Sequence, residues 1–322
     1  MRNLVTSSNS YMKTVEDFAN IRVLCIGDVM LDTFNHGNVS RISPERPVPV
    51  FRPGQVVNIP GGAANVASNI IDLGGYCTLI GVVGHDEPGR TLKSLLQHPN
   101  LSQRLVVSKD YTTTHKIRLT ASSQHLVRLD TEHQGSINDS ISTSIIDSVL
   151  QLIADHQVLV LSDYAKGVFA QSLLSSLISI AKSFDVPIVV DPKGNDLVRY
   201  SGATLLTPNS SEVEALTGIA VEDDNDAEVA GAKLLSLGNI NSALITRGSS
   251  GMTLCSTGHP TMHIPSCALD VYDVVGAGDT VVASLACALA TGSTTADAAT
   301  IANAAAGIVV GKRDTAAVTK DE

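Results

Sequence analysis

The segment D-V-V-G-A-G-D-T, residues 273–280, combines two glycines with an acid at the expected start of an apolar helix. Glycine adopts backbone angles closed to other residues, so the N–H groups of Gly276, Ala277 and Gly278 can turn toward one anion at the helix N-terminus. A carboxylate at Asp279 would then accept the proton of a hydroxyl that attacks phosphorus. These residues predict phosphoryl transfer with Asp279 as the base. The alternative is a glycine-rich turn with a capping aspartate.

The composition limits the class of partner. The chain has 322 residues, of which 43% are hydrophobic and 3% aromatic, with no tryptophan. This length and apolar content are enough for a large globular core. Subtracting 32 acidic from 22 basic residues gives a net charge of −10. A nucleic acid or an anionic membrane surface is therefore not the expected partner, and any phosphate must be met by local cations.

The ends of the chain and the cysteines indicate an intracellular protein. Residues 1–20 are polar and lack the apolar core of a signal peptide, and the five cysteines form no C-x-x-C pair. We expect free, buried thiols and a cytoplasmic location. We also expect a flexible tail at 1–20, possessing at most a short leading helix, one domain over 21–312, and a C-terminal tail at 313–322.

Short apolar runs alternate with helical stretches along most of the chain and define the predicted fold. The predicted strands cover residues 23–26, 77–83, 158–161, 187–190, 204–206 and 242–245, and polar clusters follow most of them. This alternation is typical of right-handed β-α-β units, so we predict an α/β fold with a mostly parallel sheet covered by helices on both faces. Ligands bind beyond the carboxyl ends of such strands.

Two segments interrupt this alternation and predict a small β flap, or lid. Residues 34–59 are proline-rich and irregular, and prolines restrict such strands to sheet edges. Residues 112–119 and 125–129 alternate as a hairpin with a turn at 121–124, so the lid spans about 34–59 and 112–130. Its exposed strand edges need to be covered, which predicts a homodimer that pairs through the lid.

Cations on the lid suggest an anionic substrate. Lys116, Arg118 and Arg128 lie on the predicted hairpin, and Arg41 lies on the proline-rich segment. In an acidic protein, such a local excess of positive charge favours binding of a phosphate group. A solvated strand face remains the alternative for each of these residues.

Residues near the first strand and the next helix are candidates to bind the hydroxyl groups of a substrate. Asp28 follows the first strand, Asp32 follows four residues later, and Asn65 lies on an otherwise apolar helix that opens with Gly61 and Gly62. The small residues at this helix start allow the backbone and a ligand to approach closely. The alternatives are turn chemistry for Asp28 and a buried structural amide for Asn65.

The segment N-S-S-E predicts the start of another helix. Asn209 is expected to cap this helix with Glu212 as the capping-box partner. Glu212 is also a candidate to approach a hydrated Mg²⁺, because magnesium keeps several waters and takes few carboxylates directly. The two roles are compatible.

With these motifs in order, residues 22–312 resemble the ribokinase-like carbohydrate kinases. Two signatures carry the match, G-G-A-A-N-V-A-S-N-I-I-D-L-G-G at 61–75 and D-V-V-G-A-G-D-T at 273–280. The resemblance implies an ATP- and Mg²⁺-dependent sugar kinase with Asp279 as the base. It further implies nucleotide-side roles for Lys193, Asn209, Glu212, Thr246, Gly248, Gly251 and Asn303, and sugar-side roles for Asp28, Asp32 and Asn65.

Seven further segments are most similar to one group of that family, the bacterial D-glycero-D-manno-heptose 7-phosphate kinases. They include G-D-V-M-L-D at 27–32, S-D-Y-A-K-G at 162–167 and D-P-K-G at 191–194. This resemblance implies phosphorylation of the anomeric hydroxyl to give the 1,7-bisphosphate, a step toward ADP-heptose and the lipopolysaccharide core. Val275, Arg46 and His125 depart from that group's pattern, and we expect Val275 to tune the site without inactivating it. A kinase of another sugar or sugar phosphate and a catalytically silent sugar or nucleotide sensor are the alternatives.

Overall fold

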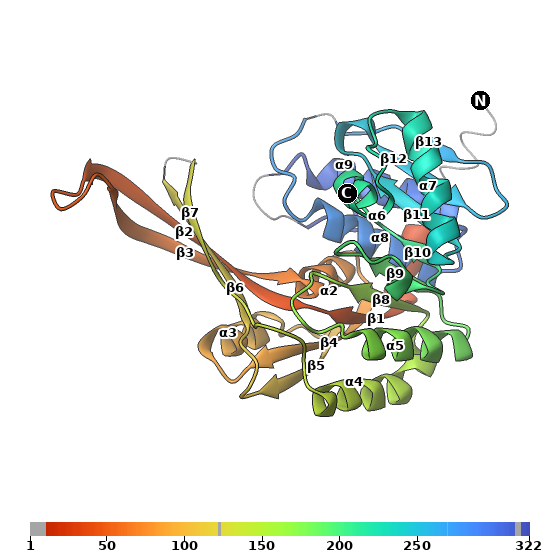
Figure 1. Ribbon diagram of the computed structural model, residues 1–322, viewed down its shortest axis with the longest axis horizontal. Helices are drawn as coiled ribbons and strands as arrows, with labels where there is room; N and C mark the ends of the chain where they lie inside the picture. Colours follow the sequence, from red (N-terminus) through yellow and green to blue (C-terminus); the bar gives the residue numbers. More distant parts are fainter. Residues whose placement is uncertain (1–10, 122–123, 269, 313–316) are drawn as a thin grey trace.

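The computed structural model describes residues 11–121, 124–268, 270–312 and 317–322. Within these residues the chain forms a large sheet flanked by helices, and a second sheet projects away from it (Figure 1). The strand order of the large sheet is β13-β12-β11-β10-β9-β8-β1-β4-β5. From β5 to β11 every pair of neighbouring strands is parallel. The pairs β11/β12 and β12/β13 are antiparallel. The predicted fold class is thereby confirmed.

The strands of the large sheet are almost fully buried, apart from the edge strands β5 and β13. In chain order they are β1 (Arg22–Gly27), β4 (Tyr76–Gly84), β5 (Leu101–Ser108), β8 (Val158–Ser162), β9 (Ile188–Asp191), β10 (Leu205–Leu206), β11 (Ser242–Thr246), β12 (Met252–Ser256) and β13 (Met262–Ile264). Strands of a parallel sheet are buried on both faces and therefore appear in the sequence as continuous apolar runs. This pattern made most of them predictable.

Helices cover both faces of this sheet and enclose two hydrophobic clusters. One cluster includes residues of α2 (Ala63–Asp72), α3 (Glu87–Leu95), α8 (Ala277–Ala290) and α9 (Thr295–Val309). The other includes residues of α4 (Asp139–Leu152), α5 (Gln171–Ser183), α6 (Ser210–Thr217) and α7 (Asp224–Gly238). Residues 279–288 of α8 are all buried, so this helix places Asp279 inside the domain.

The second sheet is the lid, with strand order β3-β2-β6-β7. It consists of β2 (Val29–Ile42), β3 (Pro49–Gly62), β6 (Thr114–Ala121) and β7 (Gln124–Thr131). The predicted lid is confirmed, but residues 34–59 are more regular than expected, because all of them except 43–48 belong to two 14-residue strands, whose pairing shifts at His36/Gly37 and Val39/Ile42. Pro49 and Pro53 lie on the edge strand β3, whereas Pro44 and Pro47 lie in the loop between the two strands. The predicted turn of the other hairpin includes residues 122–123, which lie outside the described residues.

The structure adds elements that the sequence pattern did not reveal. Strand β5 is not among the predicted strands, and α3 begins at Glu87, soon after the end of β4. The side chain of Asp86 caps this helix by accepting a hydrogen bond from the Gly89 N–H at 2.9 Å. No helix among the described residues is long and apolar enough to cross a membrane.

The two ends of the chain differ from the predicted tails. Within the predicted N-terminal tail, residues 11–16 are helical and Phe18 is fully buried, so this part of the tail packs on the domain. Residues 1–10 lie outside the described residues. At the other end, Val318 is 2% exposed and belongs to a core cluster, and Lys312 forms an ion pair with Glu322 at 2.7 Å. Residues 317–322 therefore pack against the domain.

Candidate active site

Asp279 lies in the first turn of α8 with only 6% of its surface exposed. Its carboxylate oxygens accept hydrogen bonds from two elements distant in the chain, one from the Asn65 side-chain amide and one from the Tyr164 hydroxyl, each at 2.6 Å. Burial, partly offset by these two donors, raises the pKa of Asp279 to about 6. Asp279 is therefore ionised at neutral pH, yet basic enough to take up a proton, as a general base requires.

Asn65 is held in place by a second layer of hydrogen bonds. The Asn69 side-chain amide donates to the Asn65 carbonyl at 2.9 Å and to its side-chain oxygen at 3.3 Å. The Thr280 hydroxyl donates to the Asn69 side-chain oxygen at 2.8 Å. This network joins the two family signatures, because α2 supplies both asparagines and α8 supplies Thr280 and Asp279. It orients the nitrogen of Asn65 toward the base.

The predicted anion hole lies at the N-terminus of α8. Gly276 is the N-cap residue with φ of 81°, a left-handed conformation that favours glycine. The N–H groups of Gly276, Ala277 and Gly278 were all expected to face an anion. The N–H of Ala277 instead donates to the Val274 carbonyl at 3.2 Å. Within the described residues, the N–H groups of Gly276 and Gly278 have no backbone acceptor. These two amides, at the positive end of the helix dipole, suit an anion.

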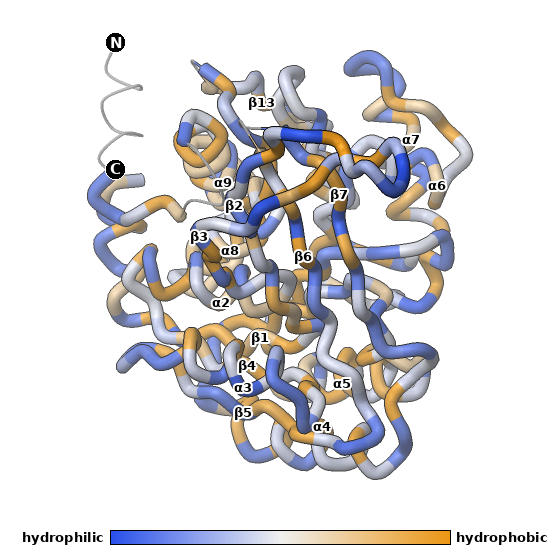
Figure 2. The backbone as a smooth tube through the Cα atoms, turned by 90° about the vertical axis from the view of Figure 1, so that its left-hand side faces the viewer, coloured by the Kyte–Doolittle hydropathy of each residue, from blue (hydrophilic) through white to orange (hydrophobic). Residues whose placement is uncertain are grey.

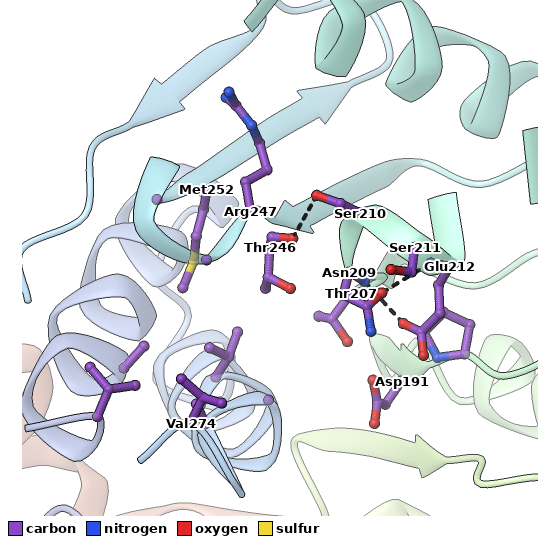
Figure 3. Close-up of a pocket in the computed structure, with 18 of the residues that line it drawn as sticks. Asp191, Thr207, Asn209, Ser210, Ser211, Glu212, Thr246, Arg247, Met252 and Val274 are labelled. Atoms are coloured by element: carbon purple, nitrogen blue, oxygen red, sulfur yellow. Dashed lines mark hydrogen bonds between the residues drawn. The ribbon is translucent and has the colours of Figure 1, made fainter. Parts of the chain in front are cut away.

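A cleft of about 1320 Å³ begins beside this helix start. Ala277 and Gly278 line it, together with the segments that follow β9, β10 and β11. In Figure 3, Val274 lies across the pocket from Asn209 and Glu212. The predicted nucleotide-side residues all lie along it, namely Lys193, Asn209, Glu212, Thr246, Gly248, Gly251 and Asn303. The side-chain amide of Asn303 donates to the Pro265 carbonyl at 2.9 Å, so this residue also fixes one wall of the cleft.

Two acidic residues of the cleft, Asp191 and Glu212, lie beside Asn209 (Figure 3). Asn209 and Glu212 form the predicted capping box of α6, and the remaining Glu212 oxygen accepts from Lys193 Nζ at 2.8 Å. In Figure 3 the carboxylate of Asp191 points into the pocket below Asn209, and it accepts no hydrogen bond from the described residues. Burial and the nearby charges of Asp279 and Glu212 raise the pKa of Asp191 well above its usual range. A cation placed here would stabilise its ionised form.

The charged residues of the lid gather on one face near Asp279. Lys116 is the cross-strand partner of Asp32 and Asp130, so these side chains share a face of the sheet. Arg118 is paired with Asp32, and Arg128 is paired with Asp130 at 2.8 Å. Lys116 forms no ion pair among the described residues, and its charge lowers the pKa of Asp279. Among the described residues, Lys116 is thus a lid cation that combines the absence of an ion pair with a position near Asp279, whereas Arg41 lies exposed near the hairpin tip.

Asp28 does not have the placement expected of a sugar ligand. It is fully buried, and its carboxylate accepts hydrogen bonds from the backbone N–H groups of Tyr164, Lys166 and Val168 at 2.8, 3.0 and 3.1 Å. The carboxylate therefore holds the loop after β8, which corrects the prediction. Position 62 also requires a glycine for a structural reason, because its φ is 58° and a Cβ there would collide with the Asp28 carbonyl.

The sequence analysis did not assign two residues that the structure places at the site, Tyr164 and Asp191. Asp191 ends the apolar strand β9, in the segment D-P-K-G. Tyr164 lies two residues after the end of β8, in the segment S-D-Y-A-K-G. This position at the carboxyl edge of the sheet was the available signal. The contact of Tyr164 with Asp279 spans 115 residues and leaves no trace in any local pattern.

Comparisons with known proteins identify the family. The chain is 43% identical over 301 residues to the bifunctional protein HldE of Gluconacetobacter diazotrophicus and 46% identical over 305 residues to that of Shewanella piezotolerans. These matches cover 93% and 95% of this chain but only 62% and 63% of the relatives, so the chain spans less than two thirds of their length.

Solved structures show the same fold at lower identity. The potassium complex of Escherichia coli phosphofructokinase-2 has a TM-score of 0.78 at 24% identity. The match covers 94% of this chain and 96% of the phosphofructokinase chain. Arabidopsis thaliana ribokinase, complexed with ribose and ATP, has a TM-score of 0.71 at 19% identity and covers 92% of this chain and 94% of its own. The sequence profile of the pfkB family carbohydrate kinases matches residues 20–322. The chain belongs to the pfkB family of carbohydrate kinases.

Proposed function

We propose that this protein transfers the terminal phosphoryl group of ATP to the anomeric hydroxyl of D-glycero-D-manno-heptose 7-phosphate. The product would be the 1,7-bisphosphate, on the route to ADP-heptose and the lipopolysaccharide core, and the reaction would take place in the cytoplasm. One observation supports the phosphoryl transfer above all. Asp279 adjoins the anion-binding helix start on one side and the charged face of the lid on the other. The seven segments similar to heptose 7-phosphate kinases and the identity to the HldE proteins support the choice of sugar.

In this mechanism the protein contributes orientation, electrostatics and one proton acceptor. The sugar hydroxyl donates to the Asp279 carboxylate, which takes its proton as the oxygen attacks the γ-phosphorus. The N–H groups of Gly276 and Gly278 stabilise the negative charge that develops on the phosphoryl oxygens. Closure of the lid over the sugar excludes water, which would otherwise accept the phosphoryl group in a wasteful hydrolysis of ATP.

Magnesium enters this proposal with ATP, as part of the substrate. The described residues contain no cluster of three or more acidic, histidine or cysteine side chains able to hold a metal on their own. Asp191 and Glu212 nevertheless fit a hydrated magnesium ion, because both line the cleft and Asp191 lacks a hydrogen-bond partner there. When bound, Mg²⁺ neutralises charge on the phosphate oxygens.

The lid is also the surface through which we propose that two copies pair. Short apolar segments alternate with hydrophilic ones along its strands (Figure 2). Several large apolar side chains there are 40% exposed or more, namely Ile42, Val48, Val56, Leu126, Val127 and Leu129. Both edge strands of the lid sheet, β3 and β7, lack an outer neighbour within the described residues. A second lid would cover these groups.

A coupled assay of ADP release over a panel of sugars and sugar phosphates tests the proposed activity. We expect the highest kcat/KM with D-glycero-D-manno-heptose 7-phosphate, because the lid presents cations to a substrate phosphate, and we expect phosphorus NMR to show a new phosphate on C1. Highest kcat/KM with another sugar would assign the kinase to that substrate. Binding of sugar and ATP without ADP release would instead indicate a sensor.

Replacement of Lys116 by alanine tests the recognition of the substrate phosphate. Because Lys116 is the half-buried lid cation without an ion pair, we expect Lys116→Ala to raise the KM for heptose 7-phosphate by roughly tenfold or more, while the KM for the unphosphorylated heptose changes little. Arg41→Ala, at the exposed hairpin tip, is the matched control. Equal effects of Lys116→Ala on both sugars would place phosphate recognition elsewhere.

A further inference from the structure

The loop that follows β8 has an unusual backbone. Ala165 adopts a left-handed conformation with φ of 54°, and Gly167 has φ of 98°. A non-glycine residue rarely adopts positive φ, and such a conformation persists only when its surroundings enforce it. Asp163 and Tyr164 of this loop line the cleft, and Tyr164 contacts the proposed base.

Several buried groups enforce this conformation. The Asp28 carboxylate accepts the three backbone N–H groups of Tyr164, Lys166 and Val168. Asp163 accepts the Ala165 N–H and the hydroxyl of Tyr200, both at 2.8 Å. Outside the loop, the hydroxyl of Tyr111 donates to the Lys166 carbonyl at 3.1 Å. The position of Tyr164 is therefore fixed from both sides of its peptide chain.

This fixed loop delivers the Tyr164 hydroxyl to Asp279. The hydroxyl donates to Oδ1 at 2.6 Å, while Asn65 donates to Oδ2 at the same distance. Two donors, one on each oxygen, determine how the carboxylate is rotated about its own bond. We propose that Tyr164 is a positioning residue, which orients Asp279 for proton acceptance and favours its ionised form, with Asp28 as the anchor of its loop. This inference rests on the proposed role of Asp279 as the base.

The charges around Asp279 make this hydrogen bond matter. Asp32 on β2 and Asp191 on β9 repel the ionised carboxylate, while Lys116 on β6 attracts it. Burial disfavours the ionised form further, so the hydrogen bonds of Tyr164 and Asn65 lower a pKa that would otherwise lie higher. Burial and the charge of Asp279 also raise the pKa of Tyr164 well above its usual range, so its hydroxyl stays a donor at every pH of interest.

The replacement Tyr164→Phe removes only the hydroxyl and keeps the ring. In the wild type, we expect kcat to fall as pH drops through about 6, because the base must be ionised to accept a proton. In Tyr164→Phe we expect this acid limb to move upward by about one pH unit and kcat at its plateau to fall by about tenfold, because a donor to a charged group is lost. The KM for ATP should change by less than about twofold.

Tyr76→Phe is the matched control, since it removes the hydroxyl of an exposed tyrosine at the start of β4, whose ring lies against Arg22 and which contacts neither the loop nor the base. We expect its pH profile to superpose on that of the wild type, and thermal unfolding should show that both variants fold. An unshifted acid limb in Tyr164→Phe, or equal shifts in the two variants, would overturn the inference. An inactive wild type, or a fully active Asp279→Asn, would overturn the proposed function instead, so the two failures are distinguishable.

Discussion

Asp279→Asn is expected to lower kcat for sugar phosphorylation by roughly 10²-fold or more, the usual contribution of a general base. The amide has the same shape but cannot take the proton of the attacking hydroxyl. The nucleotide cleft is formed by other side chains, and Asp279 does not line it. ATP should therefore bind with nearly unchanged affinity, which calorimetry can measure alongside the turnover of heptose 7-phosphate.

Asp147→Asn provides the control for this substitution, because Asp147 is an exposed residue of α4 in the region remote from the base. It should leave both turnover and ATP binding unchanged. Near-normal turnover in Asp279→Asn would remove Asp279 from the role of base. Loss of ATP binding in that variant would show that it disturbs the cleft and would require a different test of the base.

Asp28→Ala is expected to lower the free energy of unfolding by at least about 3 kcal/mol, the largest stability effect we expect at this site. The carboxylate is fully buried and accepts three backbone N–H groups, which would all lose their acceptor in the variant. Each unsatisfied buried donor costs about 1–3 kcal/mol. Urea denaturation followed by circular dichroism measures the change.

Two comparisons make the result specific to the buried hydrogen bonds. Asp147→Ala removes an exposed carboxylate and should change the free energy of unfolding by less than about 0.5 kcal/mol. Asp28→Ala should also reduce kcat, because the loop that carries Tyr164 loses its anchor. If Asp28→Ala were as stable as Asp147→Ala, and bound sugar much more weakly, Asp28 would be a sugar ligand as first predicted.

Local rules explain which parts of the fold were predictable. The capping box of α6 follows from Asn209 and Glu212 alone, because both partners lie within one helical turn. Buried parallel strands such as β8 appear as apolar runs. Strand β5 escaped prediction because it lies at the edge of the sheet, where seven of its eight residues are not buried and its sequence, L-S-Q-R-L-V-V-S, is mixed. The lid was predicted, but the length and regularity of β2 and β3 were not, because four prolines interrupt the strand pattern between residues 34 and 59.

The site was predictable where its chemistry lies within one segment. The glycines and Asp279 adjoin in the sequence, and so the anion hole and base were expected together. The role of Asp28 depends on hydrogen bonds to residues 136 to 140 positions away, and that of Tyr164 on one 115 positions away. Such tertiary contacts have no period or spacing in the sequence. An acid after a strand predicts a polar contact, but its partner is known only from the structure.

The chain enters and leaves the β2–β3 hairpin of the lid at neighbouring points, so this hairpin can be exchanged as a unit. Only Asp28 lies between β1 and β2, and the hairpin returns at Gly62, which is the cross-strand partner of Val29. The two ends of the hairpin are therefore neighbours, and Ala63 N–H bonds directly to the Asp28 carbonyl at 3.0 Å. A hairpin transplanted from a related kinase needs these two junctions and a β2 strand that pairs with β6. The fold thus permits recombination of this hairpin while the rest of the chain is inherited unchanged.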